Sequence, residues 1–309
     1  YTKELFELIY LNFTSVNFNE TGLDNFKSSL RERVRNENLN PSRVFFKKVF
    51  HAYYQDHPRR KPWNLDLIDQ IKLDKVNNFY MDRFADSSDF VFTFVGDFSI
   101  DEMKPYIEKY LGSLPSINRK ENYIDHNIRI ETESKYIEIK QNSEEKSHNY
   151  RIYSHKFKKS VKNRFTLYIL MDIVNRVLWE EIRTKQNLVY SIDVDTFGIK
   201  HFPTQNYSLY ITFESDPKNN NLIFSEIDKI LEEFKNGDFK KNYIDEAKLH
   251  QINNVNENVQ NNSFLAYAIN LYLFEDEPIT TINNLNKVIQ SISNYEIHKF
   301  SKKSFTDNF

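Results

Sequence analysis

The chain has 309 residues, enough for one large domain or two ordinary ones, and either arrangement buries a sizeable core. A net charge of −2 and an isoelectric point near 6.5 give no general case for binding nucleic acid or another polyanion. The absence of cysteine excludes disulfides, cysteine-ligated zinc and thiol catalysis, and no apolar run approaches the length of a membrane span.

The first part of the chain is predicted to be mostly helical. Apolar residues at helical spacing predict helices over 4–13, 22–36, 41–55, 64–70 and 73–84. The basic stretch DHPRRKPW (56–63) is typical of a solvated surface loop. The β-rich run DFVFTFVGD (89–97) predicts a buried strand. Ser99 and Glu102 then have the spacing of a capping box that opens a helix, which we expect to stop at Gly112.

The second part is predicted to combine strands with a run of helices. Residues 113–134 are polar and lack periodicity, which predicts an interdomain linker. Strands are predicted over 135–141, 147–157, 188–197 and 206–214. Helices are predicted over 161–183, 218–235, 240–258, 263–274, 281–290 and 294–304. Strands followed by runs of helices favour an α+β fold.

An internal repeat relates the two ends of the chain at an offset of 221 residues. Apolar positions match from Ile9 and Ile230 onward, and the last match joins Asp86 to Asp307. One shift that holds at both ends of this stretch indicates a duplication. At this offset the first unit lacks the strand-rich first half of the second. The second unit ends before its equivalent of the 89–97 strand and the helix that follows it. We therefore expect a sequence cut at both ends. The predicted domains are a partial one at 1–112, the linker at 113–134, and a second at 135–309 that lacks its last strand.

No complete hydrolase motif is visible in the sequence. A zinc hydrolase needs two histidines one helical turn apart and a carboxylate to activate the metal-bound water. The eight histidines form neither H-E-x-x-H nor H-x-x-E-H, and we interpret them as surface or loop residues. The sequence also lacks a G-x-S-x-G motif, a P-loop and a G-x-G-x-x-G motif. We therefore predict no metal site in these residues.

The remaining candidate lies in the segment WEEIRTKQNLVYSI (179–192). It reads as a helix end, a turn at 185–187 and a strand start, an arrangement that points Arg183 and Tyr190 at one place. The residues alone favour a structural interpretation. A cation such as Arg183 is stabilising at a helix C-terminus, and Tyr190 alternates with apolar residues as a core tyrosine would.

Two stretches of the sequence resemble the M16 family of zinc metallopeptidases, the insulinase–pitrilysin–processing peptidase group. LWEEIRTKQNLVYSI (178–192) resembles the stretch in the family's C-terminal half that carries an arginine and a tyrosine seven residues apart. FVFTFVGDFSIDEMKPYIEKYLGSLPS (90–116) is similar to the family's strand–helix–linker domain ending, and closer to the bacterial PqqL-like branch. The resemblance implies duplicated α+β domains of the LuxS/MPP-like metallohydrolase type, with an antiparallel-rich sheet packed on helices.

The resemblance also implies a function and roles for individual residues. It implies the C-terminal half of a zinc-dependent endopeptidase that encloses peptides or unfolded polypeptides in a chamber. Arg183 would clamp the substrate and Tyr190 would donate to the oxyanion. Trp179 would line the substrate-binding wall, although a packing role suits it equally.

The same resemblance places the zinc elsewhere. An N-terminal M16 half, in cis or as a partner subunit, would carry H-x-x-E-H, so this fragment alone is expected to be inactive. The alternative is a non-catalytic M16-like subunit that binds peptides or acts as a scaffold. No nucleic-acid partner is expected. Members of the PqqL-like branch are often exported, which favours the bacterial periplasm or cell envelope without assigning a compartment.

Overall fold

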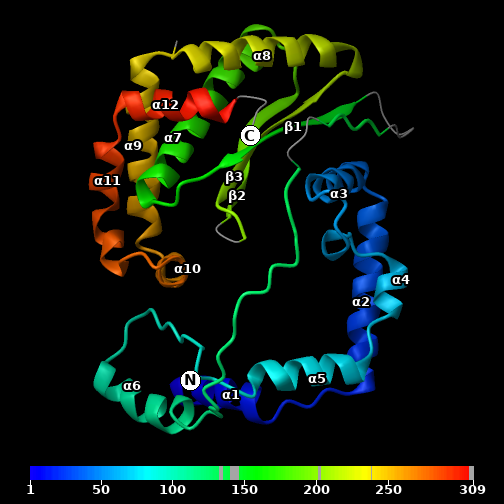
Figure 1. Ribbon diagram of the computed structural model, residues 1–309, viewed down its shortest axis with the longest axis vertical. Coiled ribbons are helices and arrows are strands. Elements are labelled where there is room, and N and C mark those ends of the chain that lie inside the picture. Colours follow the sequence, from blue (N-terminus) through cyan, green and yellow to red (C-terminus); the bar gives the residue numbers. More distant parts are fainter. Residues whose placement is uncertain (132–134, 140–145, 201–202, 238, 306–309) are drawn as a thin grey trace. The chain divides into compact units, whose positions relative to one another are not determined.

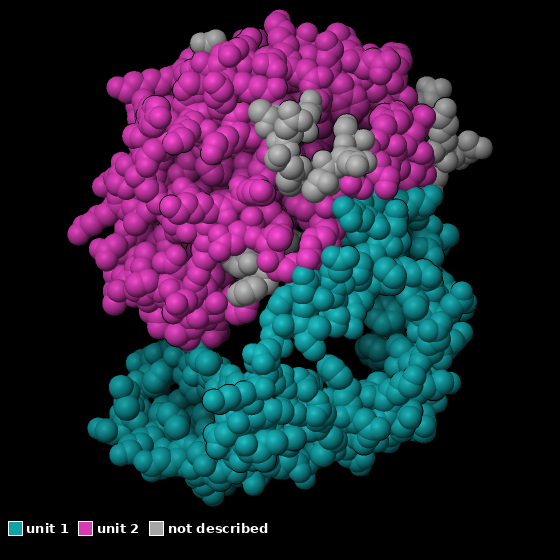
Figure 2. Space-filling view, viewed as in Figure 1, with its two compact units in different colours: residues 1–128 teal, residues 129–309 magenta. Residues whose placement is uncertain are grey.

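The computed structural model describes residues 1–131, 135–139, 146–200, 203–237 and 239–305. The chain forms two compact units, residues 1–128 and 129–309, which are coloured separately in Figure 2. Their boundary falls inside the segment predicted as a linker. The assignment of the units as M16-type domains stays a prediction.

Unit 1 is helical throughout its regular elements (Figure 1). These are α1 (Thr2–Thr14), α2 (Glu20–Asn38), α3 (Pro41–Tyr53), η1 (Pro58–Arg60), α4 (Leu65–Asp69), α5 (Leu73–Phe84), α6 (Ile100–Tyr106) and η2 (Ile107–Leu111). Each helix predicted in this part of the chain is confirmed. The last one stops before Gly112, as expected.

Side-chain caps begin several of these helices. In three places an asparagine oxygen accepts a hydrogen bond from a backbone N–H three residues later, at Asn19, Asn40 and Asn64. The capping box predicted from Ser99 and Glu102 is wrong, because the Ser99 side chain accepts no hydrogen bond at the start of α6. A capping box does form in the other unit, between Ser293 and Glu296.

The buried strand predicted over 89–97 is also wrong, although some of its aromatic side chains pack on α1. Phe92 contacts Phe13 of α1 with ring centroids 6.0 Å apart, and Phe94 stacks on Phe6 at 5.3 Å. Phe90 also contacts Phe13, so three phenylalanines of this segment pack on α1. A strand also requires a neighbouring backbone for its hydrogen bonds, and the described residues of unit 1 contain no strand.

A buried carboxylate docks the beginning of the predicted linker onto unit 1. Asp86 is 1% exposed, and its oxygens accept hydrogen bonds from the backbone N–H groups of Ser88 and Ile117, both at 3.0 Å, and of Arg119 at 2.6 Å. Burial by itself raises the pKa of Asp86, but these three N–H donors outweigh it and hold the pKa well below its usual range. The linker is thus anchored at its start.

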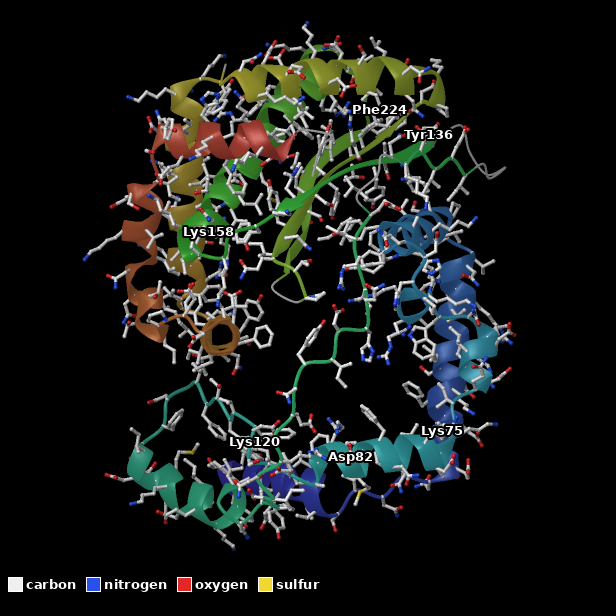
Figure 3. The ribbon with its side chains drawn as sticks, in the orientation of Figure 1. Lys75, Asp82, Lys120, Tyr136, Lys158 and Phe224 are labelled. Atoms are coloured by element: carbon white, nitrogen blue, oxygen red, sulfur yellow. The ribbon has the colours of Figure 1, made fainter. Side chains whose placement is uncertain are left out.

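We expect Asp86→Asn to lower the melting temperature of the chain at pH 7 on the order of 5 °C, because an amide cannot accept from all three N–H groups. The native pKa lies below the unfolded value of about 3.9, so the contribution of Asp86 is present above that pH and fades as the pH falls. Thermal unfolding at pH 7 and in acid checks this. The control is Asp82→Asn on α5, the helix that ends just before Asp86. Asp82 is exposed (Figure 3), so its ion pairs with Arg83 and Arg119 should contribute little; equal losses in both variants would contradict the assignment.

Unit 2 contains the sheet and the second run of helices (Figure 1). Its strands are β1 (Ser147–Lys156), β2 (Ser191–Lys200) and β3 (Asn206–Ser215). Its helical segments are α7 (Val161–Leu178), η3 (Trp179–Lys185), η4 (Pro217–Asn219), α8 (Asn220–Asn236), α9 (Lys241–Asn258), α10 (Asn262–Glu275), η5 (Ile279–Asn284), α11 (Leu285–Ser291) and α12 (Asn294–Ser304). The strand predicted over 135–141 is absent from 135–139, and its last two residues lie outside the described residues.

The sheet of unit 2 is antiparallel, with β3 in the centre and β1 and β2 on either side. The β1–β3 register runs from Ser147 opposite Ser215 to Lys156 opposite Asn206, and β2 starts with Ser191 opposite Glu214. Directly opposed residues share a face. The α+β class with an antiparallel sheet packed on helices is therefore confirmed.

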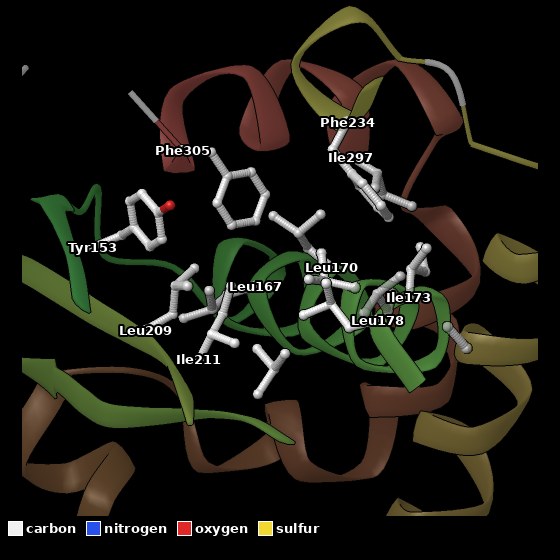
Figure 4. Close-up of a cluster of buried hydrophobic side chains, with 14 of the residues drawn as sticks. Tyr153, Leu167, Leu170, Ile173, Leu178, Leu209, Ile211, Phe234, Ile297 and Phe305 are labelled. Carbon is white, nitrogen blue, oxygen red and sulfur yellow. The ribbon is translucent and has the colours of Figure 1, made fainter. Parts of the chain in front are cut away.

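Helix α7 forms the centre of the hydrophobic core (Figure 4). It packs against β2 and against helices α8, α9, α11 and α12. One apolar stripe at helical spacing runs along α7 and η3, and it is buried except for Met171, which is half-buried; it consists of Leu167, Leu170, Met171, Val174, Leu178 and Ile182. On β3, Tyr207, Leu209, Ile211 and Phe213 are buried, as their alternation predicts.

The helices of the two units correspond at the offset of 221. Adding 221 to α1 gives 223–235, within α8; adding it to α2 gives 241–259, against α9 at 241–258. Adding it to α5 gives 294–305, against α12 at 294–304. The packing corresponds too, since α2 contacts α4 as α9 contacts α11. These matches support the duplication, which we retain as a proposal.

Candidate functional site

The candidate site is built on the junction between α7 and β2. Helix α7 starts with a side-chain cap, in which Ser160 accepts from the Asn163 N–H at 3.0 Å. At Trp179 it changes into the wider π-helical turn η3, a local form often found at functional sites. Asn187 then takes a left-handed backbone conformation with φ of 51°, which lets the chain reverse toward β2.

Arg183 lies in the last turn of this helical segment and is half-buried. Its Nη1 donates to the Asn187 side-chain oxygen at 2.7 Å, so the residue that turns the chain also holds the guanidinium. Among the described residues no carboxylate lies within ion-pair distance of Arg183. The cation still benefits from the helix C-terminus, but most of its fork remains available to a ligand.

Tyr190 is 56% exposed, so its interpretation as a core tyrosine is wrong. The strand begins one residue later than Tyr190 rather than at Leu188, because the chain is still leaving the turn. The Tyr190 N–H donates to the Glu214 carbonyl at 2.7 Å, which attaches this residue to the central strand. The phenol hydroxyl has no hydrogen-bond partner among the described residues. The hydroxyl can therefore donate to a ligand, while the backbone bond to Glu214 holds the residue in place.

The sequence analysis missed a cluster of charged and titratable groups that meets Tyr190 through Lys146. The Glu214 carboxylate pairs with Lys146 Nζ at 2.5 Å and with His148 Nδ1 at 2.8 Å. The same Lys146 Nζ lies 5.8 Å from the centroid of the Tyr190 ring. Local sequence carries no signal for this cluster, because the β1–β3 register alone brings residues 146–148 beside 214.

Trp179 is 49% exposed and precedes Arg183 by about one turn. Its exposure leaves the side chain free for a partner. No hydrogen bond, ion pair or ring contact within the described residues joins Trp179, Arg183 and Tyr190 to one another. Their convergence on one ligand therefore remains a proposal.

The described residues do not form a zinc site. A protein zinc site takes at least three side-chain ligands, and the part of the chain that the structure describes has no cluster of three such groups. His148 pairs with the carboxylate of Glu214, and His250 pairs with that of Asp172. His155 corrects the interpretation of all histidines as surface residues: it is buried, which lowers its pKa, and its ring contacts the Ser304 carbonyl.

The described residues thus form an α+β fold with Arg183 and the exposed Tyr190 at one helix–strand junction and no metal cluster. The family model for the M16 peptidase inactive domain matches residues 70–250, more than half of the chain. The chain belongs to this family. No curated protein matches its sequence.

Solved structures of bacterial proteases share this fold. The periplasmic protease PqqL from Escherichia coli matches with a TM-score of 0.84 and 14% identity over 98% of this chain and 33% of that chain. A protease from Helicobacter pylori matches with a TM-score of 0.82 and 16% identity over 99% of this chain and 75% of that chain. A peptidase M16 inactive domain from Pseudomonas fluorescens matches with a TM-score of 0.74 and 13% identity over 98% of this chain and 72% of that chain. The chain thus spans a third of PqqL, and it is similar to an M16 C-terminal half. No helix within the described residues has the length and apolar character to cross a membrane.

Proposed function

We propose that this chain is the C-terminal half of a zinc-dependent endopeptidase and that it closes over a peptide held by a zinc-bearing N-terminal half. The two units then act as a partial M16 domain and a nearly complete one, joined by the segment 113–134. The substrate is a peptide or an unfolded polypeptide. The zinc belongs to the other half, in cis or in a partner subunit.

The observation that carries this proposal is the exposed phenol of Tyr190. Peptide hydrolysis passes through a tetrahedral species whose oxygen becomes negative, and a preorganised donor stabilises that charge. Tyr190 offers such a donor, held by its backbone bond to Glu214. Arg183 offers a planar fork that can hold a neighbouring peptide carbonyl by two parallel bonds. Closure of the two halves would bring both groups to the substrate and exclude water.

The second candidate is a non-catalytic M16-like subunit that binds peptides or serves as a scaffold. It is favoured by the family description, which is that of an inactive domain. Such a subunit would still use Trp179 and Arg183 to hold a peptide, but the phenol of Tyr190 would have no oxyanion to stabilise.

A cleavage assay separates the two candidates. We expect the polypeptide or subunit pair that includes this chain and an H-x-x-E-H half to cleave quenched fluorescent peptides, and a chelator to abolish the cleavage. The 309-residue chain alone is expected to cleave nothing. Chelator-sensitive proteolysis by the chain alone would overturn the assignment of the zinc to the other half. A complete assembly that binds peptides without cleaving them would favour the scaffold.

A further inference from the structure

Residues 57–63 of unit 1, the basic loop, are held in a defined conformation. Residues 58–60 form the turn η1 between α3 and α4. His57 secures it from both ring nitrogens: Nδ1 accepts from the Arg59 N–H at 3.2 Å, and Nε2 contacts the His126 carbonyl at 3.1 Å. The loop is exposed, as a solvated surface loop is expected to be. The two His57 contacts also hold it in place.

An aromatic cluster under the basic loop fixes one of its cations. The Arg60 guanidinium carbon lies 4.5 Å from the ring centroid of Tyr54. That ring is only 3% exposed and makes edge contacts with Phe50 at 5.0 Å and Tyr53 at 4.8 Å. A guanidinium stacked on a rigid ring keeps the outer edge of its fork free for a carboxylate.

The positive charge of the basic loop is not neutralised locally. Arg59, Arg60 and Lys61 are exposed, and none of them forms an ion pair among the described residues. Trp63, two residues beyond Lys61, is 48% exposed. Three consecutive cations are therefore followed, two residues later in the chain, by an exposed indole.

The corresponding turn of unit 2 indicates that the helical array does not require these cations. Adding 221 to residues 59–61 gives Thr280, Thr281 and Ile282, within η5. The two turns share part of their backbone geometry: Gln55 and its counterpart Asp276 both have positive φ, 54° and 55°, and each segment continues into a 3-10 turn. The turn thus forms with neutral residues, and the charge of the basic loop is particular to unit 1.

We propose that the basic loop docks an acidic segment of a polypeptide. Side-chain carboxylates of that segment bind Arg59, Arg60 and Lys61, and an apolar side chain packs on Trp63. Arg–carboxylate pairs are bidentate and charge-assisted, and aromatic and arginine residues dominate the energy of protein interfaces. The proposal rests on unit 1 alone and does not depend on proteolysis by the whole protein.

The chemistry of the basic loop favours a polypeptide over other anions. Nucleic acid is bound by extended basic faces that neutralise many phosphates, whereas this patch is a single turn on a chain of net charge −2. Stable attachment to an anionic membrane likewise takes a larger basic cluster. One stacked guanidinium beside an exposed indole instead fits alternating carboxylate and apolar side chains.

Fluorescence anisotropy on the 309-residue chain tests this with a short labelled peptide of glutamate, leucine and glycine. The variant R59Q/R60Q/K61Q is expected to weaken binding by about tenfold or more, because it removes charge-assisted hydrogen bonds. Trp63→Ala should weaken it about threefold or more. Arg60→Lys should also weaken it, because lysine keeps the charge but loses the stacked fork. Binding should fall as salt rises.

The matched control removes the same charge elsewhere. K75Q/K241Q/K299Q replaces three exposed lysines that have no ion pair among the described residues, and binding should stay within about twofold of wild type. The peptide with glutamine for glutamate should not bind. The proposal is overturned if both triple variants lose equal affinity. It is also overturned if single-stranded DNA or phosphatidylserine vesicles bind more tightly than the acidic peptide through the same three cations.

Discussion

Replacing Tyr190 by phenylalanine is expected to lower kcat by roughly 10²–10³ in the active peptidase, the usual loss for one oxyanion donor. The substitution removes one hydroxyl from a side chain that is 56% exposed, so the fold should be unaffected. KM should change little, because the donor acts on a charge that develops only in the transition state. Steady-state kinetics on a quenched fluorescent peptide measures both constants.

Two further variants show whether the effect belongs to the site. Tyr295→Phe removes the same hydroxyl from a 71% exposed tyrosine on α12 and should leave kcat unchanged. Arg183→Lys should lower kcat/KM, because lysine lacks the planar fork. If Tyr190→Phe retains full turnover, Tyr190 is not the oxyanion donor, and the peptide-binding scaffold becomes the better account of this chain.

The second large effect is expected at a buried ion pair that joins α7 to α10. Arg164 and Glu275 form a salt bridge between side chains that are 10% and 2% exposed, and the Tyr272 ring lies 5.7 Å from the guanidinium carbon. Glu275→Ala leaves Arg164 buried without its partner. We expect it to reduce the free energy of unfolding of the chain by about 3–5 kcal/mol.

Denaturant unfolding checks the prediction with two comparisons. Glu181→Ala breaks the exposed pair between Glu181 and Lys185 and should cost no more than about 1 kcal/mol. The double variant R164M/E275L replaces both charges by apolar groups and should recover most of the stability, because no charge is left unpaired. If Glu275→Ala costs no more than Glu181→Ala, the buried pair does not hold α10 in place.

Regular structure was largely predictable from the sequence, because it depends on neighbours a few residues apart. The 3.6-residue spacing of apolar side chains located α7, and the two-residue alternation located β3. The offset of 221 likewise anticipated helix boundaries that agree between the units. For the candidate site, the same local reasoning placed a turn before Tyr190, and Asn187 makes it.

What only the tertiary structure decided involves residues far apart in the chain. The exposure of Tyr190 depends on where β2 joins the sheet, and its surroundings depend on Lys146 and Glu214, brought together by the β1–β3 register. Arg164 and Glu275 are 111 residues apart, so no local pattern pairs them. The segment 89–97 has the β-rich composition of a strand, but strand formation also needs a neighbouring backbone, and composition carries no information about that neighbour.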